Sequence, residues 1–432
     1  MMQYVQYPPK QYWERLLERP SANNEFVNTV VSDILQRVKD GGDQALISLT
    51  QEIEGRIVAA ITLPGSDWRF ASEQISSSLK AAIDQAIKNI RCFHSAQMEP
   101  VKKIETMTGV FCWRKSLPMK RVGLYIPGGT APLFSTLLML AIPAQIAGCK
   151  GIYVCTPTDK NGRVHPAILY AAQQTGVTEI FTIGGAQAIG ALAFGTETIP
   201  KVDKIFGPGN QYVTQAKQLV SATGVAIDMP AGPSEVAIIA DEFCNPDFVA
   251  ADLLSQAEHG IDSQVVLVSD SQRVIEKIQQ SLNVQLAKIS RNEIAIAALE
   301  NSKAILVNNL EEGMELLNAY APEHLIIACR GYESLADKVQ NAGSVFLGNY
   351  AAESVGDYAS GTNHTLPTNG FAKAFSGVSV DSFLKKTTFQ YLTETGLRNI
   401  APIVTEMALA EGLDAHANAI QVRIKQLNDE IN

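Results

Sequence analysis

The stretch RVGLYIPGGTAPLFSTLLMLAIPAQIAGCKGIYVC, residues 121–155, shows the pattern that decides the fold. A short β-branched run (122–126) leads through a glycine-rich turn into a helix-length apolar segment and a second strand-like run (151–155). Nearly continuous apolar strands, each followed by a helix, are typical of parallel sheets covered on both faces. Pro143 interrupts the apolar segment, which is short and uneven for a bilayer span. We therefore expect a buried helix and no membrane partner.

The same alternation continues toward the C-terminus. Further strand-like runs are TEIFTI (178–183), DKIF (203–206), SEVAIIA (234–240), SQVVLVS (263–269), KAILVNN (303–309), LIIAC (325–329) and SVFLG (344–348). Helix candidates lie between them at 165–176, 210–223, 246–260 and 273–289. These are too many strands for one mononucleotide-type unit, so we predict an α/β protein with two doubly wound lobes. Proline and glycine cluster at residues 226–235, which is the predicted join.

Both ends of the chain depart from this alternation. Residues 24–97 have a helical pattern, with Gly41 and Gly42 closing the first segment. From about residue 380 the strand rhythm has stopped, and we predict a helical tail that includes SFLKKTTFQYLT (382–393).

Composition narrows the function class. The 432 residues are 46% hydrophobic and 18% charged, which excludes global disorder. A net charge of −9 argues against a nucleic-acid partner and for a protein that handles small molecules. The six cysteines are scattered without a CxxC pair, and the N-terminus has no apolar signal-peptide core. These features predict a cytoplasmic protein with reduced cysteines.

Glycine-rich turns follow three of the predicted strands, at 125–132, 183–190 and 206–212. Glycine there lets the backbone approach a ligand, and helix N–H groups can accept an anion. None of the three is a G-x-G-x-x-G motif, because Tyr212 stands at the third glycine position of the last. A phosphate-containing ligand and ordinary tight turns both remain open.

The sequence LLSQAEHG (253–260) ends a predicted helix with ligand-capable residues. Gln256 and His259 are three positions apart and share a helix face, whereas Glu258 points about 100° away from His259. If this helix end binds a metal, Gln256 and His259 are the expected ligands. Taken alone, such a helix end is more often a simple cap than a metal site.

Other polar clusters leave two alternatives each. GDYASGTNH (356–364) is either a site loop or an exposed turn with Asx-type hydrogen bonds. Glu323 and His324 are equally well an acid–base pair or a solvated pair before a strand. A distant set of Gln, His, Asp and His would suit Zn²⁺. His94 and His165 have no acidic or histidine neighbours, so we expect structural roles for both.

Eight segments together closely resemble the histidinol dehydrogenase family, in the family's order over roughly residues 25–425. They are RVGLYIPGGTAPLFSTLLMLAIPAQIAGC, GGAQAIGALAFGTETIPKVDKIFGPGNQYV, AIDMPAGPSEV, DLLSQAEHG, PEHL, AGSVFLG, GDYASGTNHTLPT and AEGLDAHANAI. The resemblance implies a zinc- and NAD-dependent enzyme that oxidises L-histidinol to L-histidine through an aldehyde. It implies two NAD⁺ per histidine and one Zn²⁺ per subunit.

The resemblance also implies roles for individual residues. Glu323 and His324 would be the catalytic acid–base pair. The implied zinc ligands are Gln256, His259, Asp357 and His416. The implied NAD contacts are Tyr125, Gln187 and Asn210. The implied substrate contacts are Ser234, His364 and Glu411, together with the metal ligands and His324. Glu258 would then be a neighbouring or surface carboxylate.

The family's architecture is two Rossmann-like lobes with small terminal extensions, in a domain-swapped homodimer with shared active sites. For this chain it implies an N-terminal extension (1–23), a larger zinc and substrate lobe (24–124 with 234–378), an NAD-binding lobe (125–233) and a helical tail (379–432) that reaches the partner subunit.

Two rival functions are a zinc hydrolase, which would act without NAD, and a non-enzymatic binder with a structural metal.

Overall fold

The computed structural model describes residues 2–20, 24–128, 132–230 and 232–430. Residues 129–131 of the predicted turn at 125–132, and Ala231 of the predicted join, lie outside the described residues. The chain forms two compact units, of which unit 1 is Met1–Gln97 with Met119–Phe383 and unit 2 is Met98–Pro118 with Leu384–Asn432.

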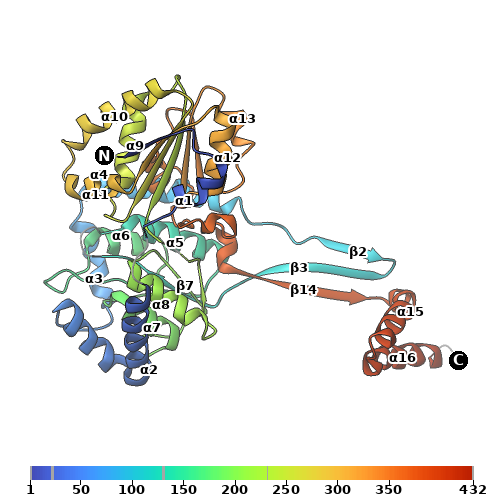
Figure 1. Ribbon diagram of the computed structural model, residues 1–432. Coiled ribbons are helices and arrows are strands. Elements are labelled where there is room, and N and C mark those ends of the chain that lie inside the picture. The colour runs from blue at the N-terminus through green and yellow to red at the C-terminus, as the bar shows by residue number, and fades with distance from the viewer. Residues whose placement is uncertain (1, 21–23, 129–131, 231, 431–432) are drawn as a thin grey trace. The chain divides into compact units, whose positions relative to one another are not determined.

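A six-stranded parallel sheet forms the larger half of unit 1. Its strand order is β1 (Gln3–Gln6), β11 (Lys303–Leu306), β10 (Gln264–Ser269), β9 (Glu235–Ala240), β12 (His324–Ala328) and β13 (Ser344–Leu347). Helices α9 (Pro246–Ala257), α10 (Gln272–Leu286) and α11 (Asn292–Glu300) cover one face, and α1 (Trp13–Leu16), α12 (Leu310–Tyr320) and α13 (Tyr332–Ala336) cover the other (Figure 1). Along β9, Val236 and Ile238 enter one core while Ala237 and Ile239 enter the other, which is why these strands read as unbroken apolar runs.

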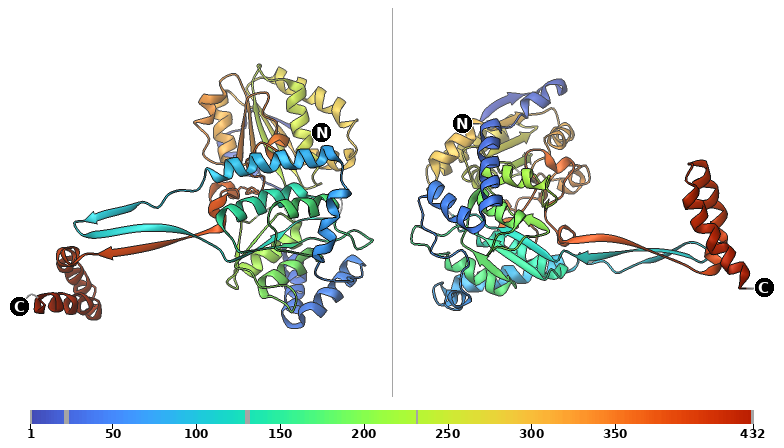
Figure 2. Two further views of the ribbon diagram at one scale, coloured as in Figure 1. Left: turned by 180° about the vertical axis from the view of Figure 1, so that it is seen from behind. Right: turned by 90° about the horizontal axis from the view of Figure 1, so that it is seen from below.

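A five-stranded parallel sheet forms the other half of unit 1. Its order is β6 (Glu179–Phe181), β5 (Gly151–Cys155), β4 (Arg121–Tyr125), β7 (Lys204–Phe206) and β8 (Ala226–Ile227). Helices α2 (Asn24–Glu54), α7 (Gly185–Phe194) and α8 (Gln211–Ser221) share one core with it. On the opposite side lie α5 (Phe134–Ala147) and α6 (Pro166–Gln174), and α4 (Ser77–Ser95) runs beside α5 (Figure 2).

These two sheets confirm the predicted mixed α/β fold with parallel sheets. All nine strand-like runs of the sequence are strands, and α5 is buried along most of its length with Pro143 inside it. Gly42 has a non-helical backbone (φ 51°), so the first helical segment of α2 ends there as predicted, and a second helical segment continues to Glu54. Strand β1 was not predicted, because a single short exposed run has no periodicity to identify it.

The lobe boundaries taken from the resemblance stay a prediction. The chain passes from β8 of the smaller sheet to β9 of the larger one across the predicted join. Helix α2 packs with the smaller sheet, whereas the predicted division groups residues 24–124 with the larger lobe. None of the helices in the described ranges has the length and apolar character that a membrane crossing requires.

Unit 2 corrects the prediction of a wholly helical tail. Its antiparallel sheet has the order β14 (Leu384–Leu392), β3 (Val110–Pro118) and β2 (Lys103–Met107), followed by helices α15 (Glu394–Ala410) and α16 (Asp414–Asp429). The segment SFLKKTTFQYLT was wrongly predicted as a helix. Phe389 stacks on Trp113 and Tyr391 on Phe111 across the β14–β3 pair, so cross-strand packing decides its conformation.

Candidate active site

The predicted acid–base pair lies at the amino end of strand β12. Glu323 is 7% exposed and His324 is 4% exposed, so they are not the solvated pair that the sequence left open. The Glu323 carboxylate accepts hydrogen bonds from the backbone N–H of Glu235 (2.9 Å) and from Nε2 of Gln256 (3.3 Å). Nδ1 of His324 donates to the backbone oxygen of Glu235 (3.2 Å). Backbone groups of the adjacent strand β9 therefore hold both side chains.

Three carboxylates surround the His324 imidazole. Nδ1 lies 3.7 Å from Oε2 of Glu323 and 3.9 Å from Oε1 of Glu353, and Nε2 lies 3.5 Å from Oδ1 of Asp357. Burial by itself would lower the pKa of His324, but the three carboxylates outweigh it and raise the pKa to about 10. Before any cation binds, the imidazole is therefore protonated at neutral pH.

The pKa values of the two buried glutamic acids are raised, as expected for acids removed from water. Burial raises the pKa of Glu323 to about 7 and that of Glu353 to about 8, although the His324 imidazolium acts in the opposite sense on both. Asp357 differs, because its hydrogen bond and attraction to His324 outweigh burial and lower its pKa. The site thus holds an ionised Asp357 beside a Glu323 that is poised near neutrality.

A metal-capable cluster adjoins the pair. Ligand atoms of His259, Glu353 and Asp357 all lie within 4.8 Å of one another. His259 follows the end of α9, where its N–H donates to the backbone oxygen of Gln256 (3.2 Å). Gln256 is 1% exposed and contacts Glu323 through its amide nitrogen, which leaves the amide oxygen as its atom for a metal.

Two observations test whether these residues fit a cation. Among the described residues, Oε1 of Glu353 is a buried polar atom without a hydrogen-bond partner. Three carboxyl groups face one imidazole, so the site offers more acidic oxygen atoms than that imidazole can pair with. An imidazole and carboxylate donor set suits Zn²⁺. The residues present fit the predicted metal.

Glu353 was not among the residues predicted from the sequence. It lies on the short helix α14 (Glu353–Tyr358), is 1% exposed and accepts a hydrogen bond from Oγ of Ser255 (3.3 Å). The available signal was its spacing of four residues from Asp357, which puts both carboxylates on one helix face. Glu258, the C-cap residue of α9, is partly exposed and lies outside the metal-capable cluster.

The loop after α14 lies next to Asp357. Nδ1 of His364 lies 2.7 Å from the backbone oxygen of Asp357, and its Nε2 lies 3.1 Å from Oγ1 of Thr136 on α5. Asn363 is 7% exposed and donates to the backbone oxygen of Met139, and its Oδ1 accepts an Asx-type bond from the N–H of Thr365 (2.9 Å). Tyr358, Ala359 and Ser360 are exposed, so both interpretations of the segment keep some support. Ser234, which immediately precedes β9, accepts from the N–H of Gln264 through its backbone oxygen (3.2 Å).

The predicted NAD residues lie at the carboxyl edge of the smaller sheet. The Tyr125 hydroxyl accepts from the N–H of Gly185 (3.2 Å), and burial raises its pKa to about 12. Gln187 is 1% exposed and donates to Glu54 (3.1 Å). Asn210 caps α8 by accepting from the N–H groups of Tyr212 and Val213. Carboxyl edges of open parallel sheets are where ligands bind, but these three roles stay predictions.

Two predicted site residues belong to unit 2. Glu411 is the C-cap residue of α15, His416 lies in the first turn of α16, and both are exposed within that unit. Their roles in substrate and metal binding stay predictions.

The two remaining histidines have structural roles, as expected. Nδ1 of His94 bonds to the backbone oxygen of Ile90 (2.9 Å), and His165 caps α6.

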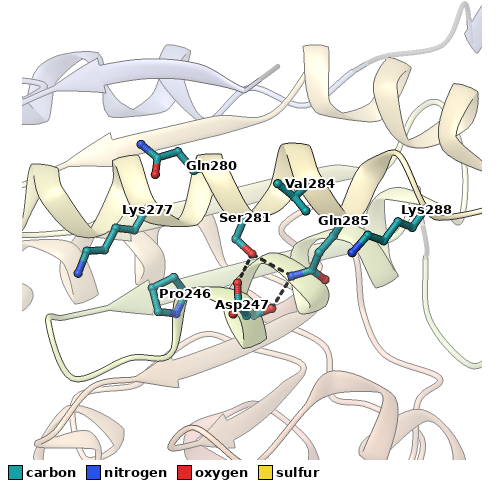
Figure 3. A pocket seen from close by; sticks show the side chains of 8 residues that line it. All are labelled: Pro246, Asp247, Lys277, Gln280, Ser281, Val284, Gln285 and Lys288. Atoms are coloured by element: carbon teal, nitrogen blue, oxygen red, sulfur yellow. Dashed lines mark hydrogen bonds between the residues drawn. The ribbon is translucent and has the colours of Figure 1, made fainter.

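A separate hollow of about 540 Å³ lies between α9 and α10 (Figure 3). Its Ser281 hydroxyl donates to Asp247, and Gln285 donates to Ser281 (3.0 Å) and to the backbone oxygen of Asp247 (2.9 Å). Only Ser281, Asp247 and Gln285 of its described lining bond to one another, and its side chains do not form a group like the Glu323–His324 pair beside the metal-capable cluster.

Comparison with known proteins identifies the family. A family model described as histidinol dehydrogenase matches residues 17–424. The chain is 56% identical to histidinol dehydrogenase of Bacteroides thetaiotaomicron, over 99% of this chain and 100% of that protein. It is 55% identical to that of Bacteroides fragilis, over 99% and 100%. The crystal structure of histidinol dehydrogenase from Elizabethkingia anophelis has a TM-score of 0.97 at 51% identity, covering 99% of both chains. The chain therefore belongs to the histidinol dehydrogenase family of oxidoreductases.

Proposed function

We propose that the enzyme oxidises L-histidinol to L-histidine through L-histidinaldehyde, as the last step of histidine biosynthesis, with one Zn²⁺ per subunit and two NAD⁺ per turnover. The observation that carries the proposal is the buried Glu323–His324 pair, which lies beside a metal-capable cluster in a chain of this family. One buried acid–base pair suits two successive oxidations at one site, since a reactive aldehyde need not be released.

We assign zinc binding to Gln256, His259 and Asp357, with His416 of the partner subunit as the fourth ligand. Bound Zn²⁺ would supply a template for the imidazole and amine of histidinol. Ser234, His364 and Glu411 are the proposed further substrate contacts. Burial lowers the pKa of His364, so its imidazole is neutral at physiological pH and suited to hydrogen bonding.

His324 is the proposed base of the alcohol oxidation, taking the hydroxyl proton as hydride leaves the carbon. With a pKa of about 10 the imidazole already carries a proton, so it becomes a base only when the field of the carboxylates weakens. A cation held at Asp357 would have this effect, because Asp357 contributes to the raised pKa. Proton acceptance by His324 is therefore tied to occupation of the metal site.

Glu323 is the proposed base of the aldehyde step, in which it takes a proton from the water that hydrates the aldehyde. Its pKa of about 7 leaves a substantial ionised fraction at neutral pH and favours release of the proton afterward. Its bonds from Glu235 and Gln256 both reach Oε2, which leaves Oε1 as the oxygen for the water.

NAD⁺ would accept the hydride in each oxidation, and we propose Tyr125, Gln187 and Asn210 as its contacts. Gly207, which follows β7, has φ 124°, and a side chain there would collide with the backbone oxygen of Tyr125. Glycine keeps the backbone close to this edge of the sheet. We further propose a cytoplasmic homodimer with shared active sites. All six cysteines are free thiols, in keeping with a reducing compartment.

The direct test is incubation of the purified enzyme with L-histidinol, Zn²⁺ and NAD⁺, with NADH and histidine both quantified. We expect two NADH for each histidine. Absence of NADH formation from histidinol would refute the proposal. Hydrolytic activity without NAD⁺ would favour the zinc hydrolase.

A further inference from the structure

One residue links the two members of the catalytic pair. Glu235, the first residue of β9, donates its backbone N–H to Glu323 (2.9 Å), and its backbone oxygen accepts from Nδ1 of His324 (3.2 Å). The orientation of this residue therefore sets the position of both catalytic side chains at once. A residue that anchors Glu235 acts on both of them.

The Glu235 side chain is itself anchored by a distant part of the chain. Its carboxylate is 2% exposed and pairs with Arg19, which lies after α1 in the N-terminal segment. Nε of Arg19 donates to Oε1 (2.5 Å) and Nη2 donates to Oε2 (2.9 Å), a two-pronged contact. The N–H of Asn369 also donates to Oε1 (2.8 Å). Such a buried carboxylate depends on these partners.

The same guanidinium also holds the approach to β12. Nη2 of Arg19 donates to the backbone oxygens of Tyr320 (2.8 Å) and Ala321 (3.4 Å), and the guanidinium lies 4.1 Å from the centre of the Tyr320 ring. Ala321 caps α12 in the left-handed conformation (φ 54°), which a residue with a side chain rarely adopts. The catalytic Glu323 follows two residues later, after Pro322.

We propose that Arg19 is a positioning residue for the catalytic pair, because one guanidinium joins the start of β9 to the turn that leads into β12. The proposal rests on the proposed function, in which Glu323 and His324 carry out the chemistry. The planar fork of an arginine makes two parallel bonds to a carboxylate while it also reaches carbonyl oxygens, whereas the ammonium of a lysine has three donors at one point and no such fork. A rival role is simple docking of the N-terminal segment, which would affect stability alone.

Trp13 offers a matched control for that rival. It belongs to the same N-terminal segment, is 7% exposed, and donates from Nε1 to the backbone oxygen of Pro8 (2.8 Å). It packs in the core between α12 and the sheet. Trp13→Phe removes the hydrogen bond and some packing but leaves every contact of Arg19 in place. It therefore weakens docking without touching the anchor of Glu235.

The experiment compares Arg19→Lys, the double variant Arg19→Met/Glu235→Gln, Trp13→Phe and the unaltered enzyme. The double variant avoids an unpaired buried carboxylate, so it tests the link even if Arg19→Lys folds poorly. Steady-state kcat, KM for histidinol, melting temperature and a crystal structure are obtained for each. We expect kcat to fall about 10- to 100-fold in both Arg19 variants, since small displacements of catalytic groups have effects of this size. KM should change by less than about two-fold, and Trp13→Phe should keep the original kcat.

Two results would overturn the proposal. One is an original kcat in the double variant, and the other is a loss of kcat in Trp13→Phe that matches the Arg19 variants at equal melting temperature. The crystal structures separate this proposal from the proposed function. If the unaltered enzyme does not oxidise histidinol but Glu323 and His324 are displaced only in the Arg19 variants, the proposed function fails and the positioning role stands. If they are not displaced, the positioning role fails by itself.

Discussion

Nε2 of His324 lies 3.5 Å from Oδ1 of Asp357, so the proposed proton carrier directly faces a proposed metal ligand. Asp357 is also the carboxylate of this site whose pKa is lowered, because the imidazolium attracts its charged form. Metal binding and proton transfer therefore share one carboxylate.

His324→Ala removes the proposed base of the alcohol oxidation. We expect kcat to fall by about 10²- to 10⁴-fold, the usual contribution of a positioned acid or base. Initial rates of NADH formation at saturating histidinol give the value. Turnover at the original rate in a variant with an unchanged melting temperature would contradict the assignment.

Glu323→Gln keeps the size of the side chain but removes its ability to take a proton from water. We expect the ratio of NADH to consumed histidinol to fall from about two toward one, because the aldehyde step is impaired while His324 remains. Trapping the aldehyde with a hydrazine reagent and measuring histidine by chromatography checks this. An unchanged ratio would exclude Glu323 as the base for hydration.

Asp357→Asn and Glu353→Gln distinguish a proposed ligand from a neighbouring carboxylate. We expect Asp357→Asn to lower zinc affinity by more than about 100-fold. Glu353→Gln should lower it by about 10- to 100-fold at most, the range for partners outside the ligand set. Zinc titration with a competing chelator measures both. The reverse order would assign Glu353 as the ligand, as its place in the metal-capable cluster allows.

The metal-free protein should lose stability as the pH rises. Folding raises the pKa of Glu323 to about 7, of Glu353 to about 8 and of His324 to about 10. Groups of this kind bind protons more tightly in the folded state, so they stabilise it below their ordinary pKa and lose that effect as the pH rises through the folded value. We expect the free energy of unfolding to fall from pH 4.5, the ordinary pKa of glutamate, to about pH 10, the folded-state pKa of His324.

Urea denaturation of chelator-treated protein across this pH range is the measurement. Glu353→Gln serves as the comparison, because it removes one shifted acid and part of the field on His324. The decline should be smaller in this variant. A stability that is constant or increases over the range would show that the three groups are not buried together as described.

Mixing inactive subunits tests the shared active site. Dimers of His416→Ala and of His324→Ala should each be inactive. If the tail of one subunit completes the site of the other, a mixed dimer has one intact site. Random reassociation of equal amounts should restore about one quarter of the original activity, because half of the dimers are mixed. No recovery after subunit exchange, verified with differently tagged chains, would contradict the shared site.

The sequence was informative where local pattern and tertiary structure agree. Nearly continuous apolar runs such as 234–240 and 263–269 are buried on both faces of a parallel sheet, so the hydrophobic pattern alone predicted them. Segment 384–392 was mispredicted because its conformation depends on pairing with β3, about 270 residues earlier along the chain. Its exposed face offers few buried positions from which a period could be read.

In the candidate site too, some residues could be predicted from local sequence and others only from the tertiary structure. Spacing of three residues already selected Gln256 and His259 over Glu258, because helix geometry is local. Whether Glu323 and His324 form a site or a solvated pair depended on burial, which the strands on either side impose. The neighbour Glu353 and the anchor Arg19 entered only with the structure, since each meets the pair across a long stretch of chain.

The sequence by itself therefore determined the two parallel sheets, the glycine-rich turns and, through the resemblance, the family. These features depend on residue order over short distances. The tertiary structure alone decided that His324 is surrounded by three carboxylates and that Glu235 holds both members of the pair. The physical reason is that charge interactions and desolvation depend on distance in space, and folding brings together groups that are remote in sequence.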